Sequence, residues 1–233
     1  MTGDNIGDWK DVLTELFLRV LIVFEGIDGT GKTTQAELLS KRLAAEGFSN
    51  EVFREPGGTG VGEGVRDLLL HKLEIKIDPV TEFLLFSASR AQLVREKIAL
   101  ALNSKKIVIL DRYFYSSIAY QGFGRGLPVP EVESISRFAT QGLAPDIVFL
   151  IQLDIETATK RMRLGRRSSD RMEDAELRFF QRVIEGFLYC AKKEPSRFVI
   201  VEGDDLVDKV SEKIFNHVMK RIRKVTEEKN ATT

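Results

Sequence analysis

The stretch of the chain best suited to chemistry is a glycine-rich loop with the spacing G-x-x-x-x-G-K-T, which is typical of phosphate-binding loops. The loop comprises Gly26, Ile27, Asp28, Gly29, Thr30, Gly31, Lys32, Thr33 and Thr34. Glycines let backbone N–H groups curl around phosphate oxygens, and a helix behind the loop adds the positive end of its dipole. We expect Lys32 to reach the β- and γ-phosphates of a nucleoside triphosphate, and the Thr33 hydroxyl to ligate Mg²⁺.

A second polar pair, Asp111 and Arg112, follows the apolar run at 106–110. Ligands of open parallel sheets bind outside the carboxyl ends of the strands, so this pair should lie beside the phosphate loop if the two strands are neighbours. Asp111 could then hold Mg²⁺ through a water molecule, and Arg112 could clamp a phosphate with two parallel bonds. The alternative is an ion pair that only ends the strand.

Three further segments are candidates for the same rim. The segment 54–59 follows the second expected strand, and the segment 116–122 ends an expected helix. Phe86 and Arg90 are four residues apart in another helix and so share one face. A ring and a guanidinium there could stack on a base and bond its edge. The alternative is a core phenylalanine beside a solvated arginine.

An arginine-rich stretch lies between two expected helices. Its members are Arg161, Arg163, Arg166, Arg167 and Arg171. Gly165 and two serines in the same stretch favour a segment that can bend. We interpret residues 163–172 as a lid that closes over a bound nucleotide. A solvated charged face is the simpler alternative, because most charge runs are that.

Apolar runs and helical periodicity predict alternating strands and helices. The expected strands cover residues 20–25, 51–54, 106–110, 146–153 and 198–201. The expected helices cover 32–46, 62–70, 79–103, 113–121, 130–141, 156–163, 173–193 and 206–226. Short apolar strands separated by helices argue for a three-layer α/β/α fold with a five-stranded parallel sheet. Together with the phosphate-binding loop, this pattern indicates a P-loop NTPase domain.

Composition narrows the class of protein. The chain has 233 residues, of which 43% are hydrophobic, and its 35 basic side chains balance 35 acidic ones, so we expect neither nucleic acid nor membrane as a partner. One cysteine fits a reducing compartment, hence a cytoplasmic location, and two histidines leave no zinc constellation. We expect a single domain at 20–226. Residues 1–19 form an extension without an assigned role or a signal-peptide pattern, and 227–233 a disordered tail.

Taken together, the motifs resemble those of the bacterial thymidylate kinases, a family of nucleoside monophosphate kinases. The resemblance runs from Val20 to the last expected helix. It rests on six motifs in the same order, at 25–34, 54–59, 86–90, 111–113, 116–122 and 170–173. It implies phosphorylation of dTMP to dTDP with ATP and Mg²⁺, for dTTP biosynthesis, by a homodimer packed through helices beside the sheet.

The resemblance also implies a dTMP site. Its members would be Asp28, Glu55, Arg66, Phe86, Arg90, Arg112, Ser117, Tyr120 and Gln121. In the family the residue matching Asp28 meets the sugar 3′-OH, and those matching Phe86 and Arg90 stack on thymine and bond its edge. Arg112 would bridge the acceptor phosphate and the transferred phosphoryl group. Tyr120 would lie under the deoxyribose, where a 2′-OH would collide with it.

Catalysis by this family implies a set of cations around the reacting phosphates. Some members carry an arginine within the phosphate loop, where this chain has Gly29, so the chain is similar to members whose lid supplies the catalytic arginines. The implied catalytic residues are Lys32, Arg112, Arg166, Arg167 and Asp28. A phosphate monoester, with a second pKa of about 6, is already anionic at neutral pH. No strong general base is therefore needed.

Two other functions fit parts of the sequence. One is a kinase of another deoxynucleoside monophosphate or of deoxynucleosides, and a deoxynucleoside kinase would need a base for the 5′-OH. The other is a non-catalytic, nucleotide-dependent switch. An Asn-Lys-x-Asp motif for guanine is absent from the sequence, and the arginine-rich segment would have no role in a switch.

Overall fold

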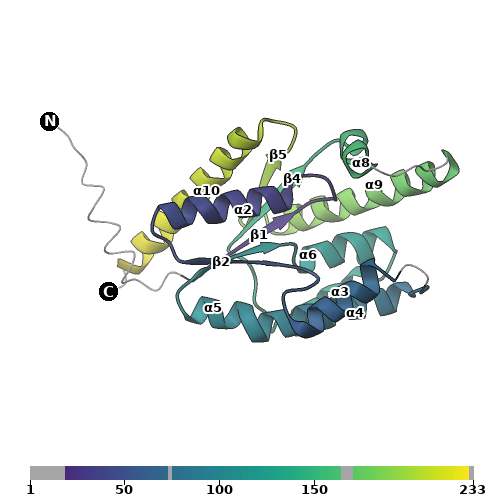
Figure 1. Ribbon diagram of the computed structural model, residues 1–233, viewed down its shortest axis with the longest axis horizontal. Helices are drawn as coiled ribbons and strands as arrows, with labels where there is room; N and C mark the ends of the chain where they lie inside the picture. Colours follow the sequence, from purple (N-terminus) through teal and green to yellow (C-terminus); the bar gives the residue numbers. More distant parts are fainter. Residues whose placement is uncertain (1–18, 73–74, 164–169, 231–233) are drawn as a thin grey trace.

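The computed structural model describes residues 19–72, 75–163 and 170–230, without the side chains of 159, 161–163, 170–176 and 224–230. Five strands form one parallel sheet in the order β2-β3-β1-β4-β5 (Figure 1). The strands are β1 (Val20–Glu25), β2 (Asn50–Arg54), β3 (Ile107–Asp111), β4 (Ile147–Gln152) and β5 (Phe198–Glu202). The predicted α/β fold with five parallel strands is confirmed.

The register of the central strands brings the two polar motifs together. Strand β1 pairs with β3 on one side and with β4 on the other, and Phe24 lies opposite Asp111. The phosphate loop leaves β1 immediately afterwards, so the loop and the Asp111 carboxylate share the carboxyl edge of the sheet. Every residue of β1 is buried, as expected for a parallel strand that is covered on both faces.

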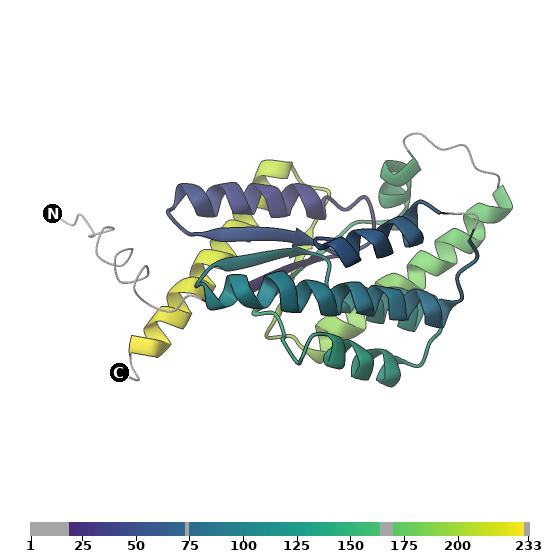
Figure 2. The ribbon, with the colours of Figure 1, turned by 60° about the horizontal axis from the view of Figure 1, so that its bottom comes forward.

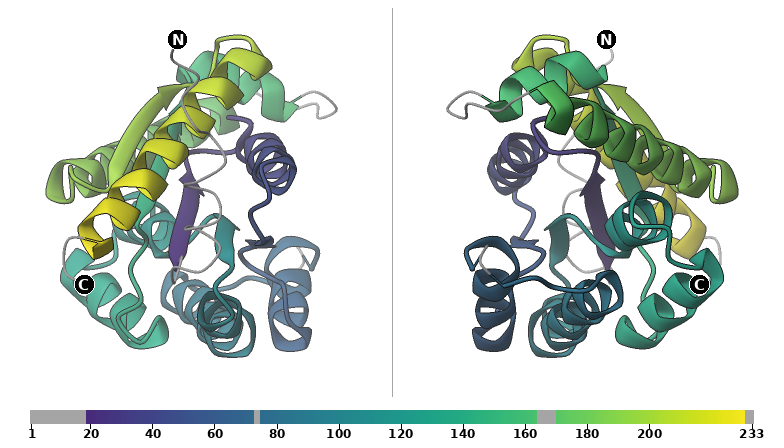
Figure 3. Two further views of the ribbon diagram at one scale, coloured as in Figure 1. Left: turned by 90° about the vertical axis from the view of Figure 1, so that its left-hand side faces the viewer. Right: turned by 90° about the vertical axis from the view of Figure 1, so that its right-hand side faces the viewer.

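One face of the sheet is covered by α2 (Lys32–Ala45) and α10 (Val207–Asn230), as Figure 3 shows end-on. Alternate residues of the strands point to these helices. Phe24 stacks on Phe149 there, with ring centroids 5.4 Å apart, and Leu39 of α2 packs in the same cluster. Burial of these side chains fixes the helix that begins at the phosphate loop against the strand that precedes it.

More helices cover the opposite face (Figure 2). They are α4 (Pro79–Leu93), η1 (Val94–Ile98), α5 (Ala99–Asn103), α6 (Phe114–Ser117), η2 (Ile118–Gly124), α7 (Val129–Ala139) and α9 (Asp170–Lys193). Two further helices pack on this layer: α3 (Gly60–Leu70) contacts α4, and α8 (Ile155–Arg163) contacts α9. Helices on both faces complete the three predicted layers.

The boundaries differ from prediction where the local backbone is unusual. Asp111 was expected just past its strand but is its last residue, and the strand ends because Arg112 adopts a φ of 74°. The helix expected at 113–121 starts at Phe114 and runs on to Gly124 through the π-helical turns of η2. The helix expected at 79–103 also contains a π-helical turn, η1.

Several apolar side chains remain on the outer surfaces of the helices. Val80 and Leu84 of α4 are 51% and 46% exposed, and Phe138 of α7 is 80% exposed. Across the three described segments, no helix combines the length and the apolar character that crossing a membrane requires. The exposed apolar side chains of α4 and α7 are candidates for contact with another protein chain.

Candidate active site

The phosphate loop takes a tight path that its glycines permit. Gly26 and Gly31 have φ values of 137° and 92°, and a Cβ on Gly26 would collide with the carbonyl oxygen of Ile151. Gly31 is the N-cap of α2, so the first backbone N–H groups of this helix point into the loop. The arrangement of strand, loop and helix confirms the structural context that a phosphate-binding motif requires.

Lys32 lies inside the loop rather than in solvent. It is 6% exposed, and its Nζ donates to the carbonyl oxygen of Ile27 at 2.8 Å. Burial, with a further contribution from Arg112, lowers the pKa of Lys32 to about 7, although Asp28 acts in the opposite direction. A phosphate in the loop would add negative charge and favour the ammonium form again.

Two oxygen-bearing side chains that could hold Mg²⁺ meet at the start of α2. The Thr33 hydroxyl donates to Oδ2 of Asp111 at 2.5 Å, so a hydroxyl and a carboxylate from neighbouring elements meet there. Hard oxygen ligands of this kind suit Mg²⁺, which keeps several waters and takes further ligands from phosphates. Among the described residues, no cluster of three or more His, Cys, Asp or Glu side chains could hold a metal. The Thr33 hydroxyl and the Asp111 carboxylate fit a Mg²⁺ that arrives with a nucleotide.

Arg112 connects the phosphate loop to the opposite side of the site. Its Nη1 donates to the carbonyl oxygen of Gly26 at 3.0 Å, and its Nη2 donates to Asp28 at 2.5 Å and to the Tyr120 hydroxyl at 3.3 Å. Burial opposes the charge of Arg112, but Tyr120 and the nearby carboxylates raise its pKa. Burial of Asp28 acts against its ionisation as well, yet Arg112 and Lys32 keep its pKa below the usual range.

Glu25, at the end of β1, was not predicted from the sequence as a site residue. Its side chain is fully buried and accepts three hydrogen bonds: from the backbone N–H of Tyr113 (2.9 Å), and from the backbone N–H (3.2 Å) and hydroxyl (2.6 Å) of Ser116. Ser116 Oγ in turn accepts from Nη1 of Arg112 at 2.9 Å. Burial raises the pKa of Glu25 to about 7 against the effect of Arg112. The sequence signal that could have identified Glu25 is a single charged residue at the end of an apolar run.

Helix α4 faces the segment α6–η2 across the other half of the site. Nη1 of Arg90 donates to the Ser117 hydroxyl at 3.1 Å, and Nε2 of Gln121 donates to Oε1 of Glu82 at 2.8 Å. Phe86 is half-buried and falls midway between Glu82 and Arg90 along α4. The structure thus brings together four of the predicted acceptor residues, and it adds Glu82, which sequence reasoning missed.

Arg90 is buried. The simpler alternative, in which Arg90 is a solvated arginine beside a core phenylalanine, is therefore wrong for Arg90. Its side chain is 1% exposed and pairs with Glu55, 3% exposed, at an N–O distance of 2.7 Å. Nε of Arg90 donates to the same carboxylate at 2.8 Å, and Nη2 donates to the carbonyl oxygen of Tyr113 at 3.4 Å. One N–H of Nη1 has no part in these bonds or in the bond to Ser117. Contact between Arg90 and a base stays a prediction.

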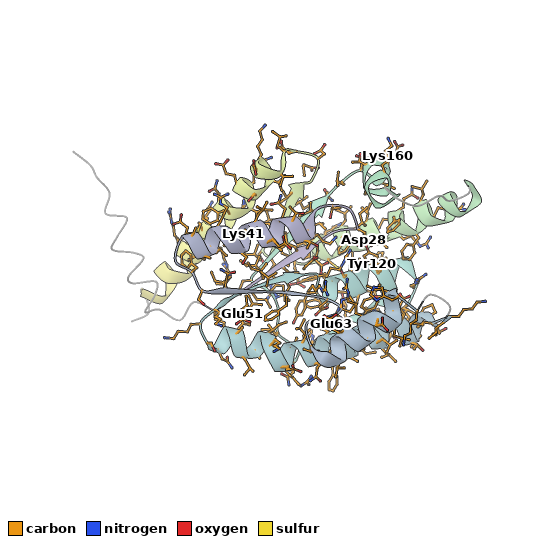
Figure 4. All side chains as sticks on the ribbon, viewed as in Figure 1. Asp28, Lys41, Glu51, Glu63, Tyr120 and Lys160 are labelled. Carbon is orange, nitrogen blue, oxygen red and sulfur yellow. The ribbon has the colours of Figure 1, made fainter. Side chains whose placement is uncertain are left out.

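The remaining predicted residues have different positions. Nη1 of Arg66 donates to the carbonyl oxygen of Pro56 at 2.9 Å, which ties α3 to the loop after β2. Burial raises the pKa of Tyr120 to about 12, so its hydroxyl stays protonated, and the guanidinium of Arg112 lies 5.1 Å from its ring. Figure 4 shows Asp28 and Tyr120 close together at the carboxyl edge of the sheet. The predicted lid residues Arg166 and Arg167 lie outside the described residues.

Comparison with known proteins gives a consistent answer. A family model described as thymidylate kinase matches residues 24–214. The thymidylate kinase of Kosmotoga olearia is 43% identical over 206 residues, which cover 88% of this chain and 98% of that protein. That of Thermoanaerobacter sp. is 47% identical over 199 residues, 85% and 97% of the two chains. The crystal structure of the Ehrlichia chaffeensis thymidylate kinase has a TM-score of 0.71 and 34% identity, over 86% of this chain and 98% of that one.

Proposed function

This chain belongs to the thymidylate kinase family, and from that premise we propose that it transfers the γ-phosphoryl group of ATP to dTMP, giving dTDP for dTTP synthesis. The observation that carries the proposal is the position of Arg112. Its guanidinium lies between Asp28 of the phosphate loop and Tyr120 of the acceptor side. A planar guanidinium there can contact a donor phosphate and an acceptor phosphate at once.

The chemical difficulty of this reaction is charge. Two polyanions must approach in line, and the transferred phosphoryl group spreads negative charge over its oxygens in the transition state. Lys32 and Arg112 provide fixed positive charge in a partly buried site, where such interactions are stronger than in water. Mg²⁺, held by Thr33 and Asp111, would supply further charge on the donor phosphates.

The acceptor would bind between α4 and α6–η2. We propose that Phe86 stacks on thymine, that Arg90 and Gln121 bond its edge, and that Tyr120 lies beneath the deoxyribose. Asp28 would meet the 3′-OH, while its bond to Arg112 orients the guanidinium before the acceptor arrives. The contact between Tyr120 and Arg112 supports discrimination against a ribonucleotide, because a 2′-OH would need space beside that ring.

We further propose a homodimer in the cytoplasm. Val80 and Leu84 lie one helical turn apart on the outer side of α4, and both are about half exposed. A second copy of the chain could bury them, and sedimentation velocity would report the dimer directly. The single cysteine, Cys190, is buried and free, which is consistent with a reducing compartment.

A coupled ADP-release assay across dTMP, dUMP, dCMP, dAMP, dGMP and thymidine tests the proposed function. We expect the highest kcat/KM with dTMP. We expect no turnover of thymidine, because Arg112 is placed to hold an acceptor phosphate, which thymidine lacks. Preference for thymidine would indicate a deoxynucleoside kinase. Absence of turnover with every acceptor, in protein that still binds ATP, would favour the nucleotide-dependent switch.

A further inference from the structure

Two helical stretches on the acceptor side carry matching rows of side chains. The members of each row are four residues apart: the first row lies on one side of α4, and the second runs from the end of α6 through η2 to the residue that follows η2. The rows are Glu82, Phe86 and Arg90, and Ser117, Gln121 and Arg125. Arg90 bonds Ser117 at one end of the pair, and Glu82 bonds Gln121 and Arg125 at the other. Along α4, Phe86 falls between the residues that make these two polar cross-links.

Both oxygens of Glu82 act as hydrogen-bond acceptors. Oε2 accepts from Nη2 of Arg125 at 3.0 Å, and Oε1 accepts from Nε of Arg125 at 3.3 Å. Oε1 also accepts from the side-chain amide of Gln121. The carboxylate is only 17% exposed, so water competes little for these positions. A carboxylate held by a guanidinium in this way can face only the NH₂ end of an amide.

This constraint decides which way Gln121 points. The two ends of a glutamine amide have nearly the same shape, and their hydrogen-bond partners determine which end lies where. Gln121 is 4% exposed, so water cannot satisfy both ends of its amide. With Nε2 on Glu82, the carbonyl oxygen Oε1 is the end left for a ligand.

The Arg90 guanidinium and the Gln121 carbonyl oxygen together match the hydrogen-bonding edge of one kind of pyrimidine. Arg90 has only donors, and Gln121 offers an acceptor. Thymine presents the O4 acceptor beside the N3–H donor, which matches both groups. Cytosine presents an amino group and an unprotonated N3, so a donor would face a donor and an acceptor would face an acceptor.

We propose that Glu82 is a specificity-determining residue, which fixes the amide of Gln121 so that its oxygen accepts the N3–H of thymine and opposes cytosine. Glu82 acts through Gln121 and is a positioning residue rather than a catalytic one. The inference rests on the proposed function, because it concerns the base of the same acceptor. It adds the source of the amide orientation, which no motif in the sequence indicated.

The test compares Glu82→Gln with a matched control. A glutamine at position 82 has nearly the same size, but it can present either an oxygen or an NH₂ group to Gln121. The amide of Gln121 then loses its fixed orientation. We expect kcat/KM for dTMP to fall about tenfold, the effect of one mispaired buried hydrogen bond. The ratio of dTMP to dCMP, in kcat/KM and in competitive binding, should fall by a similar factor. The KM for ATP should not change.

Two controls separate specificity from stability. Glu96→Gln changes an exposed Gln–Glu pair of the same kind, with Nε2 of Gln92 at 2.9 Å from Glu96, and should leave every ratio unchanged. The ratio of dUMP to dTMP is an internal control, because uracil has the same N3–H edge as thymine. In Glu82→Gln that ratio should hold while the dCMP ratio moves.

Gln121→Ala provides a second route to the answer. If Glu82 acts through Gln121, the double variant should lose no more dCMP discrimination than Gln121→Ala alone. Should Glu82→Gln fail to fold, Glu82→Ala, which removes the acceptor that fixes the amide of Gln121, should move the dCMP ratio in the same direction. An unchanged dCMP ratio in a folded Glu82→Gln, with or without a lower Tm, overturns the inference. Wild-type protein that fails to prefer dTMP contradicts the proposed function instead.

Discussion

At the scale of single residues, a buried carboxylate governs the arginine that joins the two halves of the site. Glu25 receives three hydrogen bonds from the turn that follows Arg112, and Ser116 passes the connection on to the guanidinium. Arg112 itself has a φ of 74°, a conformation that non-glycine residues adopt only when the surroundings hold them there. Glu25 and its partners supply that restraint.

The first prediction is that Glu25→Gln lowers kcat by roughly tenfold to a hundredfold, because an NH₂ donor replaces one of the acceptor oxygens that hold Tyr113 and Ser116 and, through Ser116, orient Arg112. The KM for ATP should change less than twofold. Glu51→Gln is the control. Glu51 lies in β2 and accepts a hydrogen bond from Lys106 near the amino ends of the strands, away from the site, so this variant should keep the kcat of wild type. Unchanged kcat in Glu25→Gln would reduce the role of Glu25 to stability alone.

The pH dependence of stability gives the same variant a second readout. Burial raises the folded-state pKa of Glu25 from 4.5 to about 7, so the folded chain holds this proton more tightly than the unfolded chain. The stabilisation from this group is complete below about pH 4.5 and is lost as the pH rises through about 7. Urea unfolding of wild type and Glu25→Gln should therefore diverge across this window, by up to roughly 3 kcal/mol in favour of the variant at the upper end.

The second prediction concerns Lys32, whose charge serves phosphates and not the core. Lys32→Met should reduce turnover by at least about a hundredfold, as for other electrostatic stabilisers, and leave the circular dichroism spectrum unchanged. The Tm of the nucleotide-free protein should hold or rise, because a buried ammonium is replaced by an apolar chain. Lys41→Met, on the exposed side of the same helix, should change neither quantity. Turnover within tenfold of wild type would contradict the assigned role of Lys32.

At the scale of elements, the packing of α9 on η2 sets the position of the acceptor side. A Cβ on Gly186 of α9 would lie 2.7 Å from Cα of Ala119 and 3.0 Å from the ring of Phe123. The helices approach this closely only because the residue is glycine. Tyr120 and Gln121 lie in the same π-helical segment as Ala119, so their positions depend on this contact.

The third prediction is that Gly186→Ala destabilises the protein by about 1–3 kcal/mol, the usual cost of overpacking. It should also raise the KM for dTMP, because η2 must move, while the KM for ATP stays constant. The control is Gly64→Ala in α3, where an added Cβ meets no atom within 4 Å. That change should stabilise by roughly 0.4–1 kcal/mol, so thermal melts of the two variants should shift in opposite directions.

The sequence was sufficient to predict the strands, but not every helix. Runs such as Val20–Phe24 are buried on both sides, and continuous apolar stretches of that length identify a parallel strand. The π-helical segment Ile118–Gly124 was predicted to end as an ordinary helix at Gln121. Local periodicity cannot distinguish the two, because the extra residue per turn is accommodated by packing against α9.

At the scale of the whole molecule, the site is assembled from elements far apart in the chain. The phosphate loop follows β1, Asp111 ends β3, and the acceptor rows come from α4 and α6–η2, as the labels of Figure 1 allow the reader to follow. The motifs could be predicted to meet because parallel strands share a carboxyl edge. The two carboxylates that position the side chains of these motifs could not be predicted from the sequence. The roles of Glu25 and Glu82 become visible only through their hydrogen-bond partners. Tyr113 lies 88 residues from Glu25 in the sequence, and Gln121 lies 39 residues from Glu82.

The fourth prediction concerns how the molecule completes its charge. Lys32 and Arg112 are the cations that the described residues place between the phosphate loop and the acceptor side. The family resemblance places Gly29 where some members carry an arginine, so we expect additional positive charge to come from elsewhere in the chain. Arg166 and Arg167 belong to the stretch between α8 and α9, outside the described residues, and they are the candidates that the sequence offers.

Arginines that contact the phosphates only during transfer would stabilise the transition state more than the bound substrate, and their loss would lower kcat more than it raises KM. Replacing Arg166 and Arg167 together by alanine should therefore reduce kcat by at least about a hundredfold. ATP affinity should change far less, because Lys32 and the amides of the loop remain. The matched control is the exposed pair Arg95 and Arg137, whose replacement by alanine should leave kcat unchanged. If kcat holds in the double arginine variant, the segment is a solvated face, and the catalytic charge would have to come from Arg112 or from a second subunit.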